Sequence, residues 1–175
     1  DFGKSIMTAR DVLDDLIRFF PATLELATIA TLIGVFIGVP MGVGAAVYQG
    51  QWFDHLVRVI GLFGYSVPIF WLGMVALLIF YGWLDVLPGP GRIEVFYDGL
   101  VNPVTGIILI DSALQEEWEV FWNAVDHLIL PSTILATFAL AYIARMTRSF
   151  MLDQLNQEYI LTARVKGLKE SSVIW

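Results

Sequence analysis

Three long apolar segments constrain this chain more than any other feature of its sequence. They cover residues 19–48, 56–84 and 128–148, and each meets the length of about 17–25 apolar residues that a helix needs to cross a bilayer. Hydrophobic residues make up 57% of the 175 residues, above the roughly 45–50% of typical soluble domains. A soluble chain of this length has too few residues to cover three such helices. The sequence therefore predicts an all-α, polytopic helical membrane protein with three transmembrane helices in a single domain.

Each apolar segment contains proline. Pro21 and Pro131 stand in the expected first turns of the first and third segments, where a missing N–H is tolerated. Pro68 stands near the middle of the second segment. Proline inside a membrane span is tolerated when neighbouring groups satisfy the freed carbonyl. We therefore expect a kinked second span.

The distribution of charge predicts which parts of the chain face the cytoplasm. Lysine and arginine are enriched close to the cytoplasmic ends of spans. Basic residues gather at the end of the third segment and in the tail, whereas the loop between the second and third segments is acidic. We expect residues 49–55 and 149–175 to be cytoplasmic, and residues 1–18 and 85–127 to be extracytoplasmic. The tail set is Arg145, Arg148, Arg164, Lys166 and Lys169; the loop has Arg92 against Asp85, Glu94, Asp98, Asp111, Glu116, Glu117, Glu119 and Asp126.

The acidic loop contains two further patterns. The apolar run 104–110 is too short to span a bilayer and predicts a strand or an interfacial helix. Trp118, Phe121 and Trp122 follow at helical spacing. Such aromatic side chains are typical of the membrane interface. Together with the acidic residues, these aromatic side chains could also form the rim of a surface that receives a partner from outside. The interfacial belt and the partner surface both stay open as interpretations.

Small residues recur at every fourth position of the first apolar segment. In lipid, a small-xxx-small stripe lets another helix approach closely and gain van der Waals contacts. The pattern therefore predicts a helix-packing face, within this chain or with another subunit, and by itself it does not indicate transport. Its members are Ala30, Gly34, Gly38, Gly42 and Ala46.

Three polar residues inside the apolar segments are candidates for a translocation path: Glu25, Tyr65 and Ser66. A charged side chain at the bilayer centre costs about 3 kcal/mol on insertion scales, so such residues usually face the protein interior or water. Glu25 lies near the expected outer boundary, and reaching the headgroups is an alternative. Tyr65 and Ser66 precede Pro68, and a simple kink is the alternative there.

Catalytic, metal and cofactor motifs are missing from the sequence. It contains no cysteine, which excludes disulfides and thiolate metal sites. His55 and His127 fall on opposite sides of the membrane in the expected topology and cannot share a metal. The chain has no phosphate-binding G-x4-G-K-[ST] motif and no basic surface suited to nucleic acid. We expect no enzymatic activity, no catalytic residue and no cofactor.

The segment 158–168, EYILTARVKGL, predicts a short basic helix that ends at Gly167. Glycine adopts the left-handed conformation after a helix without strain, so Leu168 is free to fold back. A helix from about 156 to 166 would present Tyr159, Thr162, Ala163 and Lys166 along one face. The segment resembles the EAA loop of ATP-binding-cassette importer permeases, in which E-A-A-x3-G docks onto the ATPase. Ala163 and Gly167 match that motif, whereas Leu161 and Thr162 replace its first two letters.

The resemblance extends along most of the chain and is strongest to dipeptide, oligopeptide and nickel permeases. The segments DFGKS, FPATLELA, VPIFWLG, LPGPG, TGIILIDSALQEEW and HLILPSTIL occur in the same order in that family. The family has a span before the D-[FL]-G segment and two after the EAA loop, which implies that this sequence is a fragment with an incomplete coupling segment. An extracytoplasmic start agrees with an earlier span.

The resemblance implies a function and a set of partners. We expect a multi-pass permease subunit in the cytoplasmic (inner) membrane that moves peptide-like solutes by alternating access. Its expected partners are the lipid bilayer, a second permease subunit, two ATP-binding subunits and an extracytoplasmic solute-binding protein. The alternatives are a non-transporting helical scaffold and, less favoured, a channel; the choice among dipeptide, oligopeptide, nickel chelate and glutathione stays open. The coupling residues implied are Tyr159, Thr162, Ala163, Arg164, Lys166 and Gly167.

Overall fold

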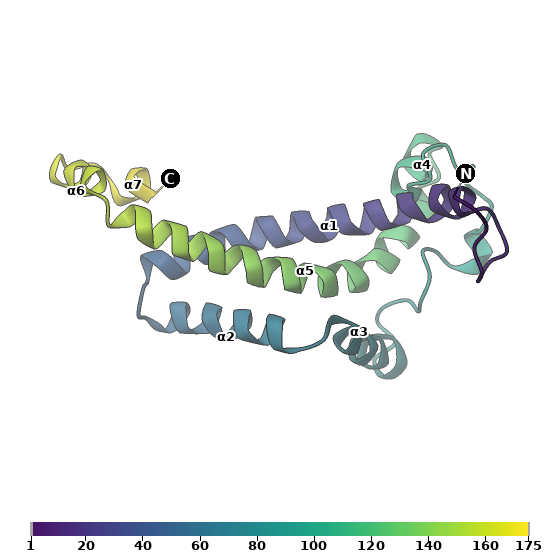
Figure 1. Cartoon of the computed structure of the whole chain (residues 1–175), viewed down its shortest axis with the longest axis horizontal. Coiled ribbons are helices and arrows are strands. Elements are labelled where there is room, and N and C mark those ends of the chain that lie inside the picture. The colour runs from purple at the N-terminus through teal and green to yellow at the C-terminus, as the bar shows by residue number, and fades with distance from the viewer. Residues whose placement is uncertain (1, 175) are drawn as a thin grey trace. The chain divides into compact units, whose positions relative to one another are not determined.

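The computed structural model describes residues 2–174, and over this range the regular elements are helical (Figure 1). One isolated antiparallel bridge joins Lys4 to Asp11. The all-α fold class is therefore confirmed. In chain order the elements are α1 (Val12–Val47), α2 (Trp52–Ser66), α3 (Ile69–Leu77), the π-helical turn η1 (Leu78–Trp83), the 3-10 turn η2 (Val95–Tyr97), α4 (Ile108–Leu114), α5 (Trp118–Leu155), α6 (Glu158–Val165) and α7 (Glu170–Ile174).

Two of the described helices, α1 and α5, are each long and apolar enough to cross a membrane. A third span is present if α2 and the α3–η1 segment count as one interrupted span. This range of two to three agrees with the three spans that hydrophobicity predicts. The agreement is expected, because a candidate span is recognised by its length and its apolar composition, and both are properties of the local sequence.

The two long helices begin earlier than the apolar segments do. α1 starts at Val12 rather than near residue 19, and α5 starts at Trp118 rather than near residue 128. Acidic residues stand in both first turns, where they interact favourably with the positive end of the helix dipole. Hydropathy identifies the part of each helix that is suited to lipid, whereas α1 and α5 both begin before that part. Pro21 and Pro131 consequently lie inside α1 and α5 instead of in their first turns.

Pro68 ends α2 rather than bending a continuous helix. α2 stops at Ser66, Val67 is extended with φ −96° and ψ 125°, and α3 begins at Ile69. The proline ring disfavours the helical conformation in the preceding residue, and proline has no N–H to donate to a carbonyl one turn back. The predicted kink is therefore a complete break in the helix.

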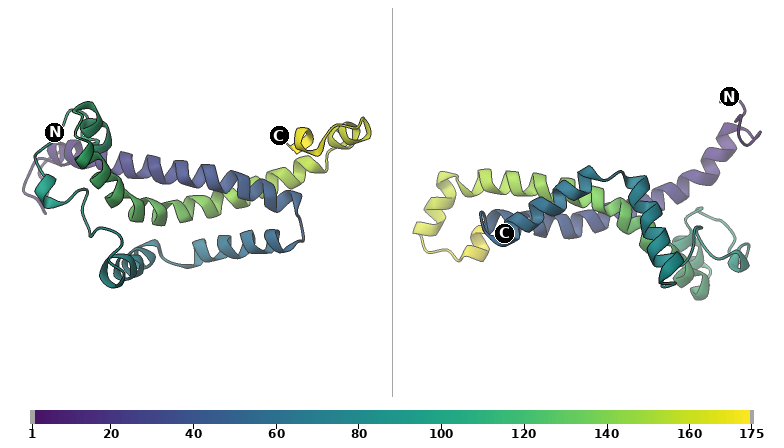
Figure 2. Two further views of the ribbon diagram at one scale, coloured as in Figure 1. Left: turned by 180° about the vertical axis from the view of Figure 1, so that it is seen from behind. Right: turned by 90° about the horizontal axis from the view of Figure 1, so that it is seen from below.

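The chain forms two compact units, which are described separately. Unit 1 comprises the chain up to Thr31 together with Ile69–Leu135, and unit 2 comprises Leu32–Pro68 together with the chain from Ala136 onward. In unit 2 the second half of α1 runs beside the second half of α5 (Figure 2). Its buried core consists of Ala45, Val57 and Ala144, with Met41 and Phe53 packed against them. In unit 1 the run 104–110 leads into helix α4 and forms no strand.

Candidate functional site

The glycines of the small-residue stripe face α5 at very short range in unit 2. A Cβ atom at Gly34 would lie 2.9 Å from the Ala139 Cβ. At Gly42 it would lie 2.6 Å from the Ala144 carbonyl oxygen. Contacts this short leave no room for a side chain. In the described structure the helix opposite these glycines is thus α5 of the same chain.

The remaining stripe residues fit the same packing. A Cβ atom at Gly38 would lie 3.1 Å from the Ile143 Cγ2, and Ala46 is buried in the same unit. Ala30, which belongs to unit 1, is also buried. Sequence reasoning did not include Gly64 of α2, where a Cβ atom would lie 2.9 Å from the Ala141 Cβ. Gly64 has no small neighbours at four-residue spacing, so the sequence pattern gave no signal for it.

Tyr65 and Ser66 make their contacts within unit 2. The Tyr65 ring meets Phe138 of α5 edge to face, with 5.5 Å between ring centroids. The Arg145 guanidinium lies 4.8 Å from the centroid of the same ring, a cation–π distance. The Ser66 hydroxyl donates a 2.7 Å hydrogen bond to the Leu62 carbonyl of its own helix. The Tyr65 ring is therefore partly exposed, whereas the Ser66 hydroxyl is already hydrogen-bonded within its own helix.

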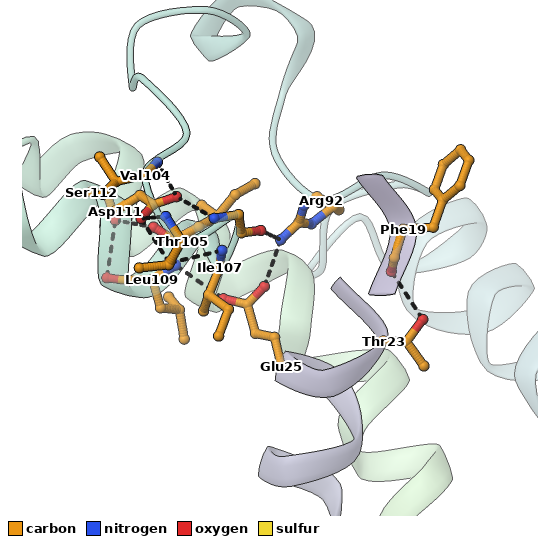
Figure 3. Close-up of polar contacts among 12 residues, drawn as sticks. Phe19, Thr23, Glu25, Arg92, Val104, Thr105, Ile107, Leu109, Asp111 and Ser112 are labelled. Atoms are coloured by element: carbon orange, nitrogen blue, oxygen red, sulfur yellow. Dashed lines mark hydrogen bonds and ion pairs between the residues drawn. The ribbon is translucent and has the colours of Figure 1, made fainter. Parts of the chain in front are cut away.

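Glu25 is buried in unit 1 and joins three segments of the chain (Figure 3). Its Oε2 accepts a 2.8 Å hydrogen bond from Nη2 of Arg92, and its Oε1 accepts a 3.0 Å bond from the backbone N–H of Leu109. The same Arg92 nitrogen donates to the Gly106 carbonyl at 3.1 Å. Both carboxylate oxygens are thus engaged, and the ion pair compensates the cost of burying the charge. In this arrangement the Glu25 side chain points to Arg92 and to the start of α4.

Asp111 organises the loop before α4 (Figure 3). Its carboxylate accepts backbone hydrogen bonds from Val104, Thr105 and Gly106 at 3.2, 2.8 and 2.9 Å, and a 2.8 Å bond from the Thr105 hydroxyl. Burial raises the pKa of Asp111, but the bonds from Thr105, Gly106 and Val104 outweigh it, so that the pKa lies below its usual value. Gly106 has φ +79°, and a Cβ there would lie 2.8 Å from the Pro21 Cγ.

A cavity of about 300 Å³ in unit 1 borders the Glu25–Arg92 pair and His127. A more apolar cavity of about 440 Å³ also borders His127 and extends along α3 and the turn 88–91. The Nδ1 of His127 lies 2.8 Å from the Asn123 carbonyl oxygen one turn back. Within residues 2–174, no group of three or more His, Cys, Asp and Glu side chains is arranged to hold a metal ion.

The buried Asp54 and the half-buried Arg148 form an ion pair in unit 2 that sequence reasoning missed. Nε and Nη2 of Arg148 donate to the two carboxylate oxygens at 2.6 and 2.9 Å, and the Gly50 N–H donates to Oδ2 at 3.0 Å. The Asp54 side chain is only 1% exposed. Arg58 lies farther away, at 3.5 Å, and its side chain is 49% exposed. The sequence showed Arg148 only as part of a basic topology signal, because its partner lies 94 residues away.

The tail forms a helix–turn–helix in which Gly167 has φ +80°, the left-handed conformation that the sequence predicts. The Leu168 N–H bonds to the Ala163 carbonyl at 3.3 Å, and the Gly167 N–H bonds to the Arg164 carbonyl at 2.9 Å. These two bonds form a Schellman motif, which closes a helix at its C-terminus. Arg164 pairs with Glu170 of α7 at 2.9 Å. The chain therefore reverses between α6 and α7.

The residues expected on one face of α6 lie mostly at the surface. Tyr159, Thr162 and Lys166 are exposed and Ala163 is partly buried, whereas Ile160 is buried. The Tyr159 hydroxyl donates a 2.6 Å hydrogen bond to Oε1 of Gln154 at the end of α5. α6 therefore presents a largely open surface while its beginning is attached to α5.

Comparison with known proteins adds an independent line of evidence. Residues 38–175 match the family described as binding-protein-dependent transport system inner membrane component. The probable D,D-dipeptide transport system permease protein DdpB of Escherichia coli K12 is 49% identical over 168 residues, which are 96% of this chain and 49% of that protein.

Two further relatives cover nearly the whole chain at 44% identity. The di/tripeptide transport system permease protein DppB of Pseudomonas aeruginosa UCBPP-PA14 aligns over 175 residues, which are 100% of this chain and 52% of that protein. The dipeptide transport system permease protein DppB of Escherichia coli K12 aligns over 176 residues, 99% of this chain and 52% of that protein. The chain spans about half the length of the curated relatives it matches.

Proposed function

Because this chain belongs to the family of binding-protein-dependent transport system inner membrane components, we propose that it is part of the permease subunit of an ATP-driven importer for peptide-like solutes. The observation that carries the proposal is the 44–49% identity to permeases whose names specify dipeptides, D,D-dipeptides or di- and tripeptides. The two to three candidate spans suit a subunit that forms part of a membrane pathway.

The proposed partners are two ATP-binding subunits, a second permease subunit and an extracytoplasmic solute-binding protein. The family description itself refers to dependence on a binding protein. These 175 residues contain no motif that holds ATP phosphates, and in this proposal the separate ATP-binding subunits supply the energy. The acidic, aromatic segment 85–127 is proposed to face outward, where the binding protein would dock.

The proposed coupling site is the helix–turn–helix formed by α6 and α7, and Tyr159, Thr162, Ala163, Arg164, Lys166 and Gly167 are its proposed residues. An exposed helix followed by a sharp reversal is suited to insertion into a groove on a partner. The Schellman motif at Gly167 and the Arg164–Glu170 ion pair support this proposal because both hold the reversal in place.

The three proposed path residues, Glu25, Tyr65 and Ser66, differ in how readily their side chains could contact a solute. Tyr65 is 38% exposed and its ring can contact a passing solute. Glu25 uses both oxygens to hold Arg92 and the start of α4, so a role in the path requires this pair to open. The Ser66 hydroxyl would first have to leave the Leu62 carbonyl.

Transport assays with the full-length protein test the proposed function. The permease, co-expressed with its genomic neighbours and reconstituted into vesicles, should take up labelled di- and tripeptides when ATP and the binding protein are present. Unlabelled peptides should compete. Failure of an ATPase subunit to co-purify, together with no ATP-dependent uptake, would favour the scaffold alternative. Preferential uptake of sugars would exclude the peptide-like class.

Substitutions at the turn test the coupling site. Gly167→Val places a β-branched residue at positive φ, which disfavours the reversal by about 1–2 kcal/mol, a factor of roughly 5–30 in population. We expect Gly167→Val and Ala163→Asp to insert normally but to release the ATPase or lose ATP-driven uptake. Gly167→Asn is the matched control, because asparagine tolerates this conformation better. Normal assembly and uptake in both damaging variants would show that the segment only sets topology.

A further inference from the structure

We propose that Asp54 and Arg148 form a positioning pair that couples α6 to the turn between α1 and α2, residues 48–51. Through this pair, displacement of α6 by a bound ATPase would move the cytoplasmic ends of α1 and α2. The inference rests on the proposed function, because it assigns a role within an ATP-driven cycle. Neither the family description nor the names of the relatives assign a role to either residue.

A single carboxylate holds three parts of unit 2 together. Asp54 stands in the first turn of α2, accepts both hydrogen bonds from Arg148 of α5, and accepts the Gly50 N–H of the α1–α2 turn. A planar guanidinium that binds both carboxylate oxygens restricts orientation as well as distance. The pair therefore sets the rotation of α5 relative to the start of α2.

The packing around the pair leaves little room for independent movement. A Cβ at Gly42 of α1 would lie 2.6 Å from Thr147, the residue next to Arg148. A Cβ at Gly44 of α1 would lie 2.8 Å from the ring of Phe53, which stands at the start of α2. Close-packed interiors transmit displacement because they cannot deform continuously. We therefore infer that the ends of α1, α2 and α5 move together.

The C-terminal end of α5 connects the pair to α6. From Arg148 the helix α5 continues to Leu155, a rise of about 10 Å at 1.5 Å per residue. The end of α5 is then linked to the start of α6 by the Tyr159–Gln154 hydrogen bond of 2.6 Å. The Asn156 amide donates to the Leu152 carbonyl at 2.9 Å and holds the connection in place. A push on α6 thus reaches Arg148 through the two-residue turn 156–157, which these hydrogen bonds bridge, and the last two turns of α5.

A contiguous route alone does not prove coupling, which requires an energetic test. Substitutions that preserve the shape of a side chain can distinguish a role of the pair in positioning the helices from a role in folding. Asp54→Asn keeps the volume and one acceptor but removes the charge. Arg148→Lys keeps the charge but loses the two-bond geometry. Arg58→Gln is the matched control, because Arg58 faces the same carboxylate at 3.5 Å and is half exposed.

The experiment uses the full-length permease in its complete complex, reconstituted into vesicles with the binding protein. Wild-type ATP-dependent uptake is established first, and its absence would refute the proposed function rather than this inference. For each variant, assembly, ATP hydrolysis and peptide uptake are measured. We expect Asp54→Asn and Arg148→Lys to assemble and hydrolyse ATP, while peptide imported per ATP falls by about tenfold. Arg58→Gln should behave like the wild type.

A double variant tests whether the two residues act as one unit. If they do, Asp54→Asn combined with Arg148→Lys should lower peptide per ATP no further than the more damaging single change. Additive losses would overturn the inference, because they would mean that the residues act separately. Unchanged peptide per ATP in both single variants would also overturn it. Loss of assembly in both would overturn it as well, since the pair would then serve folding alone.

Discussion

At the scale of single residues, three buried carboxylates each hold another part of the chain in place. Glu25, Asp54 and Asp111 are all buried, and each accepts hydrogen bonds from residues distant in sequence or from a loop. A buried charge is tolerated only when it is paired or well hydrogen-bonded. Each of these side chains therefore specifies where its partner segments must lie, and removal of a partner leaves a charge uncompensated.

Arg92→Met should destabilise the segment around α4. The change leaves the Glu25 carboxylate, 4% exposed, without its counterion. Removing one partner of a fully buried pair costs about 3–5 kcal/mol; because Arg92 is 39% exposed, we expect about 1–3 kcal/mol. Limited proteolysis of the full-length protein should then cut residues 92–107 faster. Arg18→Met, at an exposed arginine in the same unit, is the control, and equal cleavage in both variants would contradict the prediction.

Asp111 should make the same loop sensitive to acid. Its pKa in the folded protein lies below its usual value, so its stabilising effect is present above about pH 4. That effect is lost as pH falls further, toward the lowered folded pKa. Hydrogen exchange at Val104, Thr105 and Gly106, corrected for intrinsic rates, should therefore show protection that is constant from pH 7 to 5 and declines below 4. Asp111→Asn should lower protection at every pH and flatten this dependence; an unchanged profile would argue against it.

At the scale of helices, glycines of α1 lie directly against α5 within unit 2. In lipid, helices gain little from hydrophobicity and associate through close van der Waals contact. The glycines at positions 34, 38 and 42 permit this contact with α5. Helix α2 contributes Gly64 on a different segment, against Ala141. Small residues on two helices thus allow both to approach α5.

The same substitution at two glycines should have opposite effects. At Gly42, an added methyl group would lie 2.6 Å from a carbonyl oxygen of α5, and we expect Gly42→Ala to destabilise by about 1–3 kcal/mol. At Gly61 of α2 no described atom outside its own helix lies within 4 Å. Gly61→Ala should therefore stabilise by up to about 1 kcal/mol through helix propensity. Unfolding of the purified full-length variants in detergent measures both; destabilisation of equal size would refute the packing argument.

At the scale of the whole molecule, charge asymmetry predicts the topology. Residues 85–127 are acidic and the tail is basic, and the positive-inside rule then places the tail in the cytoplasm. The proposed functions of the two regions depend on this orientation. A tail that docks onto an ATPase must face the cytoplasm, and a loop that receives a binding protein must face outward.

Cysteine labelling tests this topology. These 175 residues contain no cysteine; any cysteine elsewhere in the full-length protein is first replaced by serine, so that a single introduced cysteine reports alone. Val95→Cys, at a 90% exposed position in the loop, should react with a membrane-impermeant maleimide in intact spheroplasts. Ser171→Cys, exposed in α7, should react only after permeabilisation. The reversed pattern would invert the topology and exclude α6 as an ATPase contact.

The sequence by itself determined the helical membrane class and the turn at Gly167. Both follow from local physics: backbone groups in lipid must be satisfied within a helix, and glycine alone adopts positive φ without strain. The small-residue stripe likewise indicated a packing face, although not its partner. These features depend on residues only a few positions apart.

Only the tertiary structure decided which groups meet. Glu25 and Arg92 are 67 residues apart and Asp54 and Arg148 are 94 apart, and no spacing rule connects such positions. The sequence suggested a role in a translocation path for Glu25 and a topology signal for Arg148, whereas the structure shows that each has an ion-pair partner. The break at Pro68 also depends on context, because a proline in a span can either bend or end a helix. Pairing of buried charges is set by distance in space, which the linear order of residues does not contain.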